Sequence, residues 1–357
     1  MHADDSQVTL ETLPREVIER IFGHAMYDET QAGRLDMLVI CRALAQPAQT
    51  AFLADIFQPI LYRLNELCIY LIRNADRVRL IRSLTVYLSP ACLSENDSAY
   101  NVSQILAILI RQLTSLRSLD IAVADDWPRE AWTGARMNEA LATPSGLRHL
   151  SFTEDRDEVI PLESTLNAIG NSGGRLRELA WGGSFAQVAV DGPWQSLLAG
   201  LTRLILSPAK LSASAVCLPH VVALRSFALT IYRWDPAEDA EFARHLVSLA
   251  PRLHDLEMED VRPDGERNQV SLLATLCPAL TALQELILND MGASADAMLL
   301  LPPTLRSIVL GKPTIGMLSV LPTVVTLRLP MLRELRLKSS PREFYDGLRD
   351  VALEVRH

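Results

Sequence analysis

The sequence predicts an α/β protein in which a long solenoid of alternating strands and helices follows a small all-helical module. Three observations predict it. Leucine supplies 60 of the 357 residues, although only 6% of the residues are aromatic. One short apolar pattern recurs ten times between residues 81 and 337. The chain is also longer than the ~250–300 residues at which a single compact core stops growing, so a core that lengthens by repetition suits it.

The recurring pattern is an apolar residue, two residues, an apolar residue, one residue and a third apolar residue. The ten copies begin at Ile81, Leu116, Leu147, Leu176, Leu201, Leu224, Leu253, Leu283, Leu305 and Leu332, on average about 28 residues apart. Each copy ends with strand-like alternation, which places two apolar side chains on one side and one residue on the other. Stacked copies would join their leucines into one ladder, in which each buried side chain contributes ~1.5–3 kcal/mol.

The segments between the copies have helical periodicity. Residues 101–113 and 239–249 place apolar side chains three or four positions apart, and Asn101 or Ser103 could cap the first helix. Prolines stand just before several of the next strands, where they end a helix. One strand and one helix per copy predict a horseshoe with parallel strands on its concave face and helices on its convex face. Residues 348–353 are compatible with a short eleventh strand.

Residues 80–357 resemble the leucine-rich-repeat family, whose unit of ~20–29 residues contains a strand. The resemblance implies a solenoid of about 10–11 repeats. The asparagine or cysteine that the family carries after the third apolar position is absent from this sequence, so an asparagine ladder is not carried over.

The predicted helical module covers residues 10–57. Thr12 can cap a helix whose first turn holds Pro14 and Glu16, residues that are favourable there. A second amphipathic run covers residues 35–44, and Pro47 opens a third helix that is predicted to continue through Phe57. Residues 1–9 are polar and expected to be disordered, and residues 58–79 are expected to form a helical bridge to the solenoid.

The Leu-Pro-x-Glu-Val-Ile-x-x-Ile-Phe string from Leu13 and the later Leu-x-x-Leu-x-x-Cys-Arg segment resemble an F-box. In that family the segment docks on the Skp adaptor of a cullin–RING ubiquitin ligase. The resemblance implies that the adaptor contacts are Leu13, Pro14, Glu16, Val17, Ile18, Ile21, Phe22, Leu38, Cys41 and Leu44, the last of which stands where the family often has tryptophan.

The function that the resemblance implies is that of a non-catalytic substrate-recognition subunit of an SCF-type E3 ubiquitin ligase. Two other interpretations stay open. The N-terminal helices can serve only as the cap that a terminal repeat needs. The whole chain can also be an adaptor-independent leucine-rich-repeat scaffold or inhibitor.

The concave face of such a solenoid is exposed between and just after the strand leucines. The substrate-binding candidates there are Tyr87, Asp120, Asp255, Glu257, Glu259, Asp260, Glu285, Asn289, Asp290, Arg336 and Lys338. Six of these are acidic residues on two adjacent repeats, which indicates either a docking patch for a basic partner or an ordinary solvated face. Ile205, Ile287 and Val309 are expected to point outward on the same face and are further contact candidates.

Other function classes lack their sequence signals. No run reaches the ~18 apolar residues of a membrane helix, and the first residues lack an apolar signal core, so we expect a cytoplasmic or nuclear protein. A net charge of −9 argues against nucleic-acid binding, which needs clustered cations. The five cysteines have no Cys-x-x-Cys spacing and are expected to be small buried residues.

Catalysis is not expected either. Residues 170–174 fit the Gly-x-Ser-x-Gly string around Ser172, but a helical run precedes them and a strand follows, the reverse of a nucleophile elbow. They are predicted to form a glycine-rich turn. No metal-ligand spacing and no phosphate-binding loop is present, so the sequence predicts no metal, no cofactor and no enzymatic activity.

Overall fold

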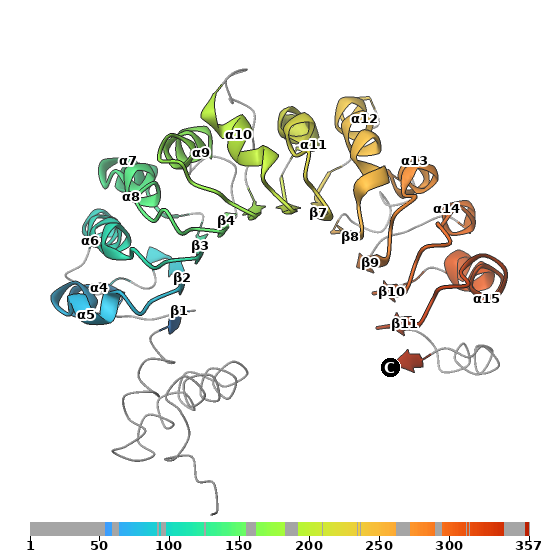
Figure 1. The fold of residues 1–357 in the computed structure, drawn as a ribbon, viewed down its shortest axis with the longest axis horizontal. Helices are drawn as coiled ribbons and strands as arrows, with labels where there is room; N and C mark the ends of the chain where they lie inside the picture. Colours follow the sequence, from blue (N-terminus) through green and yellow to red (C-terminus); the bar gives the residue numbers. More distant parts are fainter. Residues whose placement is uncertain are drawn as a thin grey trace, which may run out of the picture. The chain divides into compact units, whose positions relative to one another are not determined.

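The computed structural model describes residues 54–58, 64–90, 93, 98–124, 126–154, 162–182, 192–208, 210–233, 235, 237–261, 272–289, 295–311, 313, 315–338 and 354–356. The chain divides into two compact units, Met1–Leu147 and Arg148–His357, and each contains a stack of strand–helix repeats (Figure 1).

The described elements of the first unit are β1 (Asp55–Gln58), α4 (Leu64–Arg73), α5 (Ala75–Val78), β2 (Ser83–Leu88), α6 (Ala99–Gln112), β3 (Ser118–Val123), α7 (Arg129–Gly134) and α8 (Met137–Leu141). Those of the second unit begin with β4 (His149–Glu154), α9 (Leu162–Asn171), β5 (Glu178–Trp181), α10 (Pro193–Ala199), β6 (Arg203–Leu206), α11 (Leu211–Ser214), η3 (Ala215–His220) and β7 (Ser226–Ile231). They continue with α12 (Ala240–Leu249), η4 (Ala250–Arg252), β8 (Asp255–Asp260), α13 (Leu272–Leu276), η5 (Cys277–Ala279), β9 (Glu285–Asn289), α14 (Ala295–Leu299), β10 (Ser307–Leu310), α15 (Ile315–Arg328), β11 (Glu334–Leu337) and β12 (Glu354–Arg356).

The strands of each unit pair in parallel, and their order follows the chain. In the second unit, the middle apolar residues of the copies stand opposite one another from strand to strand: Leu150, Leu179, Leu204, Phe227, Leu256, Leu286, Ile308 and Leu335. Parallel neighbours need a crossover connection, which the helix of each repeat supplies. The strands of this unit lie on the inner side of an arc and the helices on its outer side (Figure 1).

The core consists of the predicted ladder. All three apolar positions of each of the ten copies, from Ile81 to Leu337, are buried. The pleat explains this, because alternate side chains of a strand point to opposite faces. In β8, for example, Leu256 and Met258 are buried while Glu257 between them is partly exposed. The prediction of a leucine-rich-repeat solenoid is therefore confirmed for the described residues.

The helices bury the faces that their periodicity predicts, but neither Asn101 nor Ser103 is the cap of the first helix. Helix α12 buries Phe242, Leu246 and Leu249. Helix α6 is capped by Ser98, whose side chain accepts a hydrogen bond from the backbone N–H of Asn101 at 3.2 Å. Ser103, one of the two predicted caps, is buried. The helix therefore begins two residues before the predicted start at residue 101, because a serine in extended conformation can satisfy its first free N–H groups.

The sheet begins earlier than predicted. Residues 55–58 form β1, which pairs in parallel with Ser83–Val86 of β2, and the N–H of Arg82 donates to the carbonyl of Ala54 at 2.9 Å. The helix predicted to run through Phe57 is therefore wrong for residues 55–57, because pairing with β2 provides their backbone hydrogen bonds. Helices α4 and α5 lie between two strands, as the helices of the later repeats do. The predictions for residues 1–53 lie outside the described residues.

A further strand, β12, lies directly after the stretch predicted to form an eleventh strand. β12 pairs in parallel with Glu334–Arg336 of β11, whereas the stretch predicted for an eleventh strand, residues 348–353, lies outside the described residues.

Across the part of the chain that the structure describes, no helix combines the length and the apolar character needed to cross a membrane.

Candidate functional site

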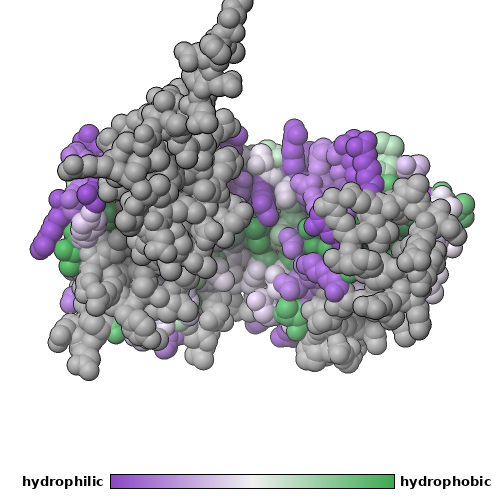
Figure 2. All heavy atoms as spheres, turned by 90° about the horizontal axis from the view of Figure 1, so that it is seen from below, coloured by the Kyte–Doolittle hydropathy of each residue, from purple (hydrophilic) through white to green (hydrophobic). Residues whose placement is uncertain are grey.

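The strand side of the second unit carries the largest group of predicted binding residues. Residues between the buried ladder positions stand opposite one another from strand to strand, and one such row consists of Ser151, Ala180, Ile205, Ala228, Glu257, Ile287, Val309 and Arg336. A second row contains Thr230, Glu259 and Asn289. Where the described residues of the second unit are visible in Figure 2, hydrophobic and hydrophilic side chains lie side by side on the surface.

Strands β8 and β9 place four carboxylates on this side. Asp255, Glu257 and Glu259 alternate with the buried residues of β8, and Glu285 stands opposite Asp255 on β9. All four side chains are partly exposed. We call these four residues the acidic inner face. Like charges on adjacent strands repel one another, so this arrangement favours the approach of a positively charged group.

Polar contacts connect the acidic inner face to the C-terminal strands. The side-chain amide of Asn289 donates to Glu257 at 3.2 Å and accepts a hydrogen bond from the Lys338 ammonium at 3.2 Å. Because Lys338 follows β11 and Asn289 ends β9, this chain of contacts crosses β10. Lys338 is exposed, so its charge remains available to a partner.

A second polar group lies at the start of β10 and β11. Glu334 binds the Arg336 guanidinium at 2.6 Å and accepts a hydrogen bond from the hydroxyl of Ser307 at 3.2 Å. Glu334 is absent from the predicted site, although it occupies the same position of the repeat as Asp255 and Glu285. Comparing equivalent positions across the copies, rather than searching for local clusters, would have identified it.

Several predicted residues lie elsewhere. Asp260 is only 2% exposed, so its assignment to the binding surface is wrong; it ends β8 in the inward phase of the pleat, opposite buried Ile231. Val309 was expected to point outward and is also buried. Tyr87 and Asp120 lie on β2 and β3 of the first unit, where the Thr85 hydroxyl donates to Asp120 at 3.4 Å.

The remaining predicted site residues belong to segments that the structure does not describe. Asp290 lies outside the described residues, and so do all ten predicted adaptor contacts: Leu13, Pro14, Glu16, Val17, Ile18, Ile21, Phe22, Leu38, Cys41 and Leu44.

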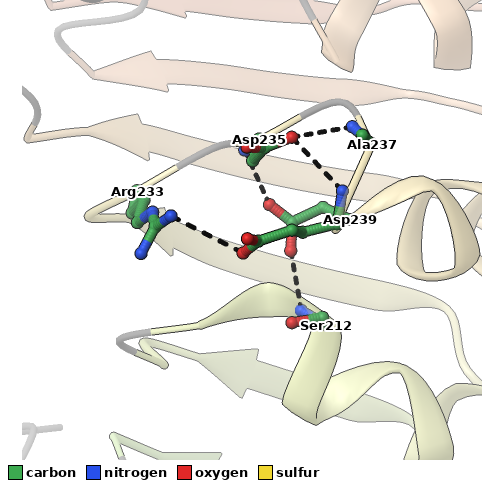
Figure 3. A network of polar contacts seen from close by, with 6 residues as sticks. Ser212, Arg233, Asp235, Ala237 and Asp239 are labelled. Atoms are coloured by element: carbon green, nitrogen blue, oxygen red, sulfur yellow. Dashed lines mark hydrogen bonds and ion pairs between the residues drawn. The ribbon is translucent and has the colours of Figure 1, made fainter.

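A buried carboxylate fixes the loop that follows β7, next to the acidic inner face. Asp239 is 4% exposed and accepts hydrogen bonds from the backbone N–H groups of Ser212 and Asp235, both at 2.8 Å (Figure 3). It thereby ties the start of α12 to the start of α11 in the preceding repeat. The loop carries Arg233, whose guanidinium lies 3.6 Å from Glu238.

Asp235 tightens the same loop from its exposed side. Its carboxylate accepts hydrogen bonds from the backbone N–H groups of Ala237 at 2.8 Å and Glu238 at 3.2 Å (Figure 3). These bonds stabilise the ionised form and lower the pKa of Asp235. Tyr232 begins this fixed loop and is 53% exposed. The sequence alone did not predict that Tyr232 would lie at the start of a loop fixed by Asp235 and Asp239, directly after β7 in the chain.

Ser172 and the described cysteines could in principle act as nucleophiles, but Ser172 lies in a turn and the cysteines lie in the core. The hydroxyl of Ser172 donates to the carbonyl of Ile169 at 2.8 Å at the end of α9, and Gly173 has φ +75°, so the predicted glycine-rich turn is confirmed.

Cys68, Cys217 and Cys277 are buried free thiols. Desolvation raises the pKa of Cys68 and of Cys277 to about 12 and also raises the pKa of Cys217.

These thiols are therefore protonated at neutral pH and poor nucleophiles. Cys41 and Cys92 lie outside the described residues. Among the residues with described positions, no three His, Cys, Asp or Glu side chains are grouped so that they could hold a metal ion.

No family model matches the chain, and no curated protein matches it. Among solved structures, an internalin from Listeria monocytogenes is similar over 82% of this chain and 93% of its own, with 14% identity and a TM-score of 0.34. A structure of the Rad7 and Elc1 complex in yeast is similar over 96% of this chain and 92% of that chain, with 12% identity and a TM-score of 0.39. The parallel strand pairing and the buried ladder define the fold.

Proposed function

We propose that this protein works by holding another protein rather than by chemistry of its own, and that its acidic inner face binds a basic segment of that partner. The observation that carries the proposal is the placement of Asp255, Glu257, Glu259 and Glu285 on two adjacent strands. Their backbones are fixed in one parallel sheet, so little ordering entropy remains to be lost when a partner binds. Lys338 bounds the acidic surface through Asn289 and provides a charge of opposite sign.

We further propose that the N-terminal segment links this binding surface to ubiquitin transfer. The F-box-like motif from Leu13 to Phe22 supports docking on the Skp adaptor of a cullin–RING ligase. The protein would then be the substrate-recognition subunit of an SCF-type E3 ligase. Its contribution would be proximity, because holding a substrate beside the charged enzyme raises the effective concentration of the reactants.

Co-expression with the Skp adaptor tests this second proposal. We expect the full chain to co-purify with the adaptor in equal amounts, and the double variant Leu13→Ala, Pro14→Ala to lose the adaptor while its circular dichroism spectrum stays unchanged. A matched control, Glu257→Lys with Glu259→Lys, should retain the adaptor because it changes only the inner face. Failure of the unaltered chain to bind the adaptor would contradict its proposed role as a substrate-recognition subunit of an SCF-type ligase.

The binding role of the inner face is tested separately. A fluorescent lysine-rich peptide should bind the full chain, and the Glu257→Lys, Glu259→Lys variant should bind it at least about tenfold more weakly, a loss of about 1.4 kcal/mol. The Leu13→Ala, Pro14→Ala variant should bind the peptide as the unaltered chain does. Unchanged peptide affinity in the inner-face variant would contradict the role of the acidic inner face.

One observation favours the adaptor-independent alternative. β1 (Asp55–Gln58) overlaps the last residues of the predicted module and is the first strand of the described sheet. An edge strand left uncovered would expose unpaired backbone groups, and the segment that precedes β1 in the sequence could supply the cap that such an edge needs. If the Leu13→Ala, Pro14→Ala variant loses thermal stability and the unaltered chain binds no adaptor, the module is a cap and the protein is a leucine-rich-repeat scaffold or inhibitor.

A further inference from the structure

Arginine occupies the second position of the repeated pattern in seven of the ten copies. In the second unit this position lies just before each strand, and hydrogen bonds connect the backbones in sequence. The N–H of Arg177 donates to the carbonyl of Arg148 at 2.7 Å, that of Thr202 to Arg177 at 2.8 Å, and that of Arg225 to Thr202 at 2.9 Å. The arginines of β4–β7 therefore form a row along one edge of the sheet.

This edge is strongly basic over β4–β7. Residues 147–150, 175–179, 201–204 and 224–227 contain five arginines, one histidine and a single carboxylate, that of Glu178, which binds His149 at 3.2 Å. The five arginines, all exposed, are Arg148, Arg175, Arg177, Arg203 and Arg225. We call them the arginine edge. Their concentration contrasts with the net charge of −9 of the whole chain.

Internal contacts account for only some of the exposed arginines of this unit. Arg148 donates to the carbonyl of Arg175 at 2.9 Å, and Arg252 donates to that of Val222 at 3.0 Å. Such bonds satisfy backbone carbonyls at the ends of helices and turns. In the part of the chain that the structure describes, the guanidinium groups of Arg177, Arg203 and Arg225 make no hydrogen bond or ion pair.

We propose that the arginine edge is a docking surface for an extended acidic segment of a protein partner. Like charges on adjacent strands are destabilising, so unpaired cations in a row favour an anion that binds across them. Three strand spacings of about 4.8 Å make the edge about 14 Å long, which about five extended residues would cover. This surface is separate from the acidic inner face, and the proposal does not depend on the function proposed above.

The chemistry of the edge favours a polypeptide over a nucleic acid. The residues that form the edge include no tyrosine, phenylalanine or tryptophan that is exposed for base stacking. Partly exposed Ala180 and Ile205 lie in the adjacent row of the strand side and could accept apolar side chains of an acidic peptide.

The test uses the full chain and a fluorescent peptide made of four Glu-Glu-Leu triplets, with binding followed by fluorescence anisotropy. We expect the Arg177→Glu, Arg225→Glu variant to bind this peptide at least about tenfold more weakly than the unaltered chain. The matched control is Arg306→Glu with Arg333→Glu, which changes exposed residues at the same position of the repeat before β10 and β11. This control should change the affinity less than about twofold.

Three results would overturn the proposal: no binding of the acidic peptide at low salt, equal losses in the two double variants, or tighter binding of a single-stranded oligouridine than of the peptide. If the Arg177→Glu, Arg225→Glu variant does not fold, as judged by circular dichroism, Arg177→Gln with Arg225→Gln removes the same charges without adding new ones. This substitute must show the same selective loss of affinity.

Discussion

The two halves of the second unit, β4–β7 and β8–β11, have the same backbone plan but carry differently charged surfaces. Both halves bury the same three apolar positions of each copy and pair in the same parallel register. The edge of β4–β7 is basic, whereas β8 and β9 carry the acidic inner face. The comparison teaches that the ladder constrains only the inward residues, so outward residues can change sign from one repeat to the next without affecting the stack.

The cores of the two halves also differ. Phe152, Trp181 and Phe227 replace aliphatic residues at ladder positions in β4–β7, and the rings of Phe152 and Trp181 meet edge to face with centroids 5.1 Å apart. The ladder positions of β8–β11 hold only leucine, isoleucine and methionine. An aromatic pair adds about 0.5–1.5 kcal/mol beyond its buried area, so the first half is expected to depend on a few large contacts.

The largest expected effect tests the feature that the two halves share. Leu204→Asp in β6 and Leu256→Asp in β8 should each destabilise the protein by more than about 5 kcal/mol, because each places an unpaired charge in the ladder and leaves a cavity. Urea unfolding followed by circular dichroism measures the loss. Glu257→Gln, at the outward neighbour of Leu256, should stay within about 0.5 kcal/mol of the unaltered chain. Similar losses for Leu256→Asp and Glu257→Gln would refute the ladder.

The second prediction concerns the difference between the cores. Trp181→Ala should cost about 3–5 kcal/mol because it removes both buried area and the contact with Phe152. A double-mutant cycle with Phe152→Leu should give a coupling of about 0.5–1.5 kcal/mol. The matched cycle in β8 and β9, Met258→Leu with Leu288→Met, should show coupling near zero. Equal coupling in the two cycles would mean that the cores do not differ in this way.

The third and smallest effect compares a buried thiol in each half, Cys217 before β7 and Cys277 before β9. Burial raises both pKa values in the folded state, that of Cys277 to about 12. The folded protein therefore retains a proton that the unfolded chain loses near pH 8.5, so the stabilising contribution is complete below that pH and is lost as the pH rises toward 12.

Urea unfolding between about pH 8 and pH 10 measures this dependence. Cys277→Ala and Cys217→Ala should each reduce the alkaline loss of stability by at most about 1.4 kcal/mol per pH unit. Because each variant is compared with the unaltered chain at the same pH, the titration of tyrosine and lysine cancels. An unchanged alkaline slope in both variants would show that the thiols ionise alike in the folded and unfolded states.

The sequence by itself determined the repeating fold. Apolar residues at fixed positions in ten copies have one efficient way to be buried, because a strand sends alternate residues to opposite faces and one unit cannot cover its own apolar face. The ladder from Ile81 to Leu337 and the helical faces such as Phe242, Leu246 and Leu249 could therefore be predicted from periodicity. The acidic residues of β8 could also be placed on one surface, because that surface follows from the same alternation.

Only the tertiary structure decided the features that depend on neighbouring chain segments. The segment 55–58 has only four residues, too few for a pattern that predicts a strand. It is a strand because it pairs with β2. Strand β8 extends as far as Asp260, and so buries this side chain, through its pairing with Ile231 of β7. The link from Lys338 to Asn289 joins residues that are 49 positions apart. The physical reason is common to all three: hydrogen bonds and burial between repeats depend on which strands lie side by side, and local sequence patterns do not contain that information.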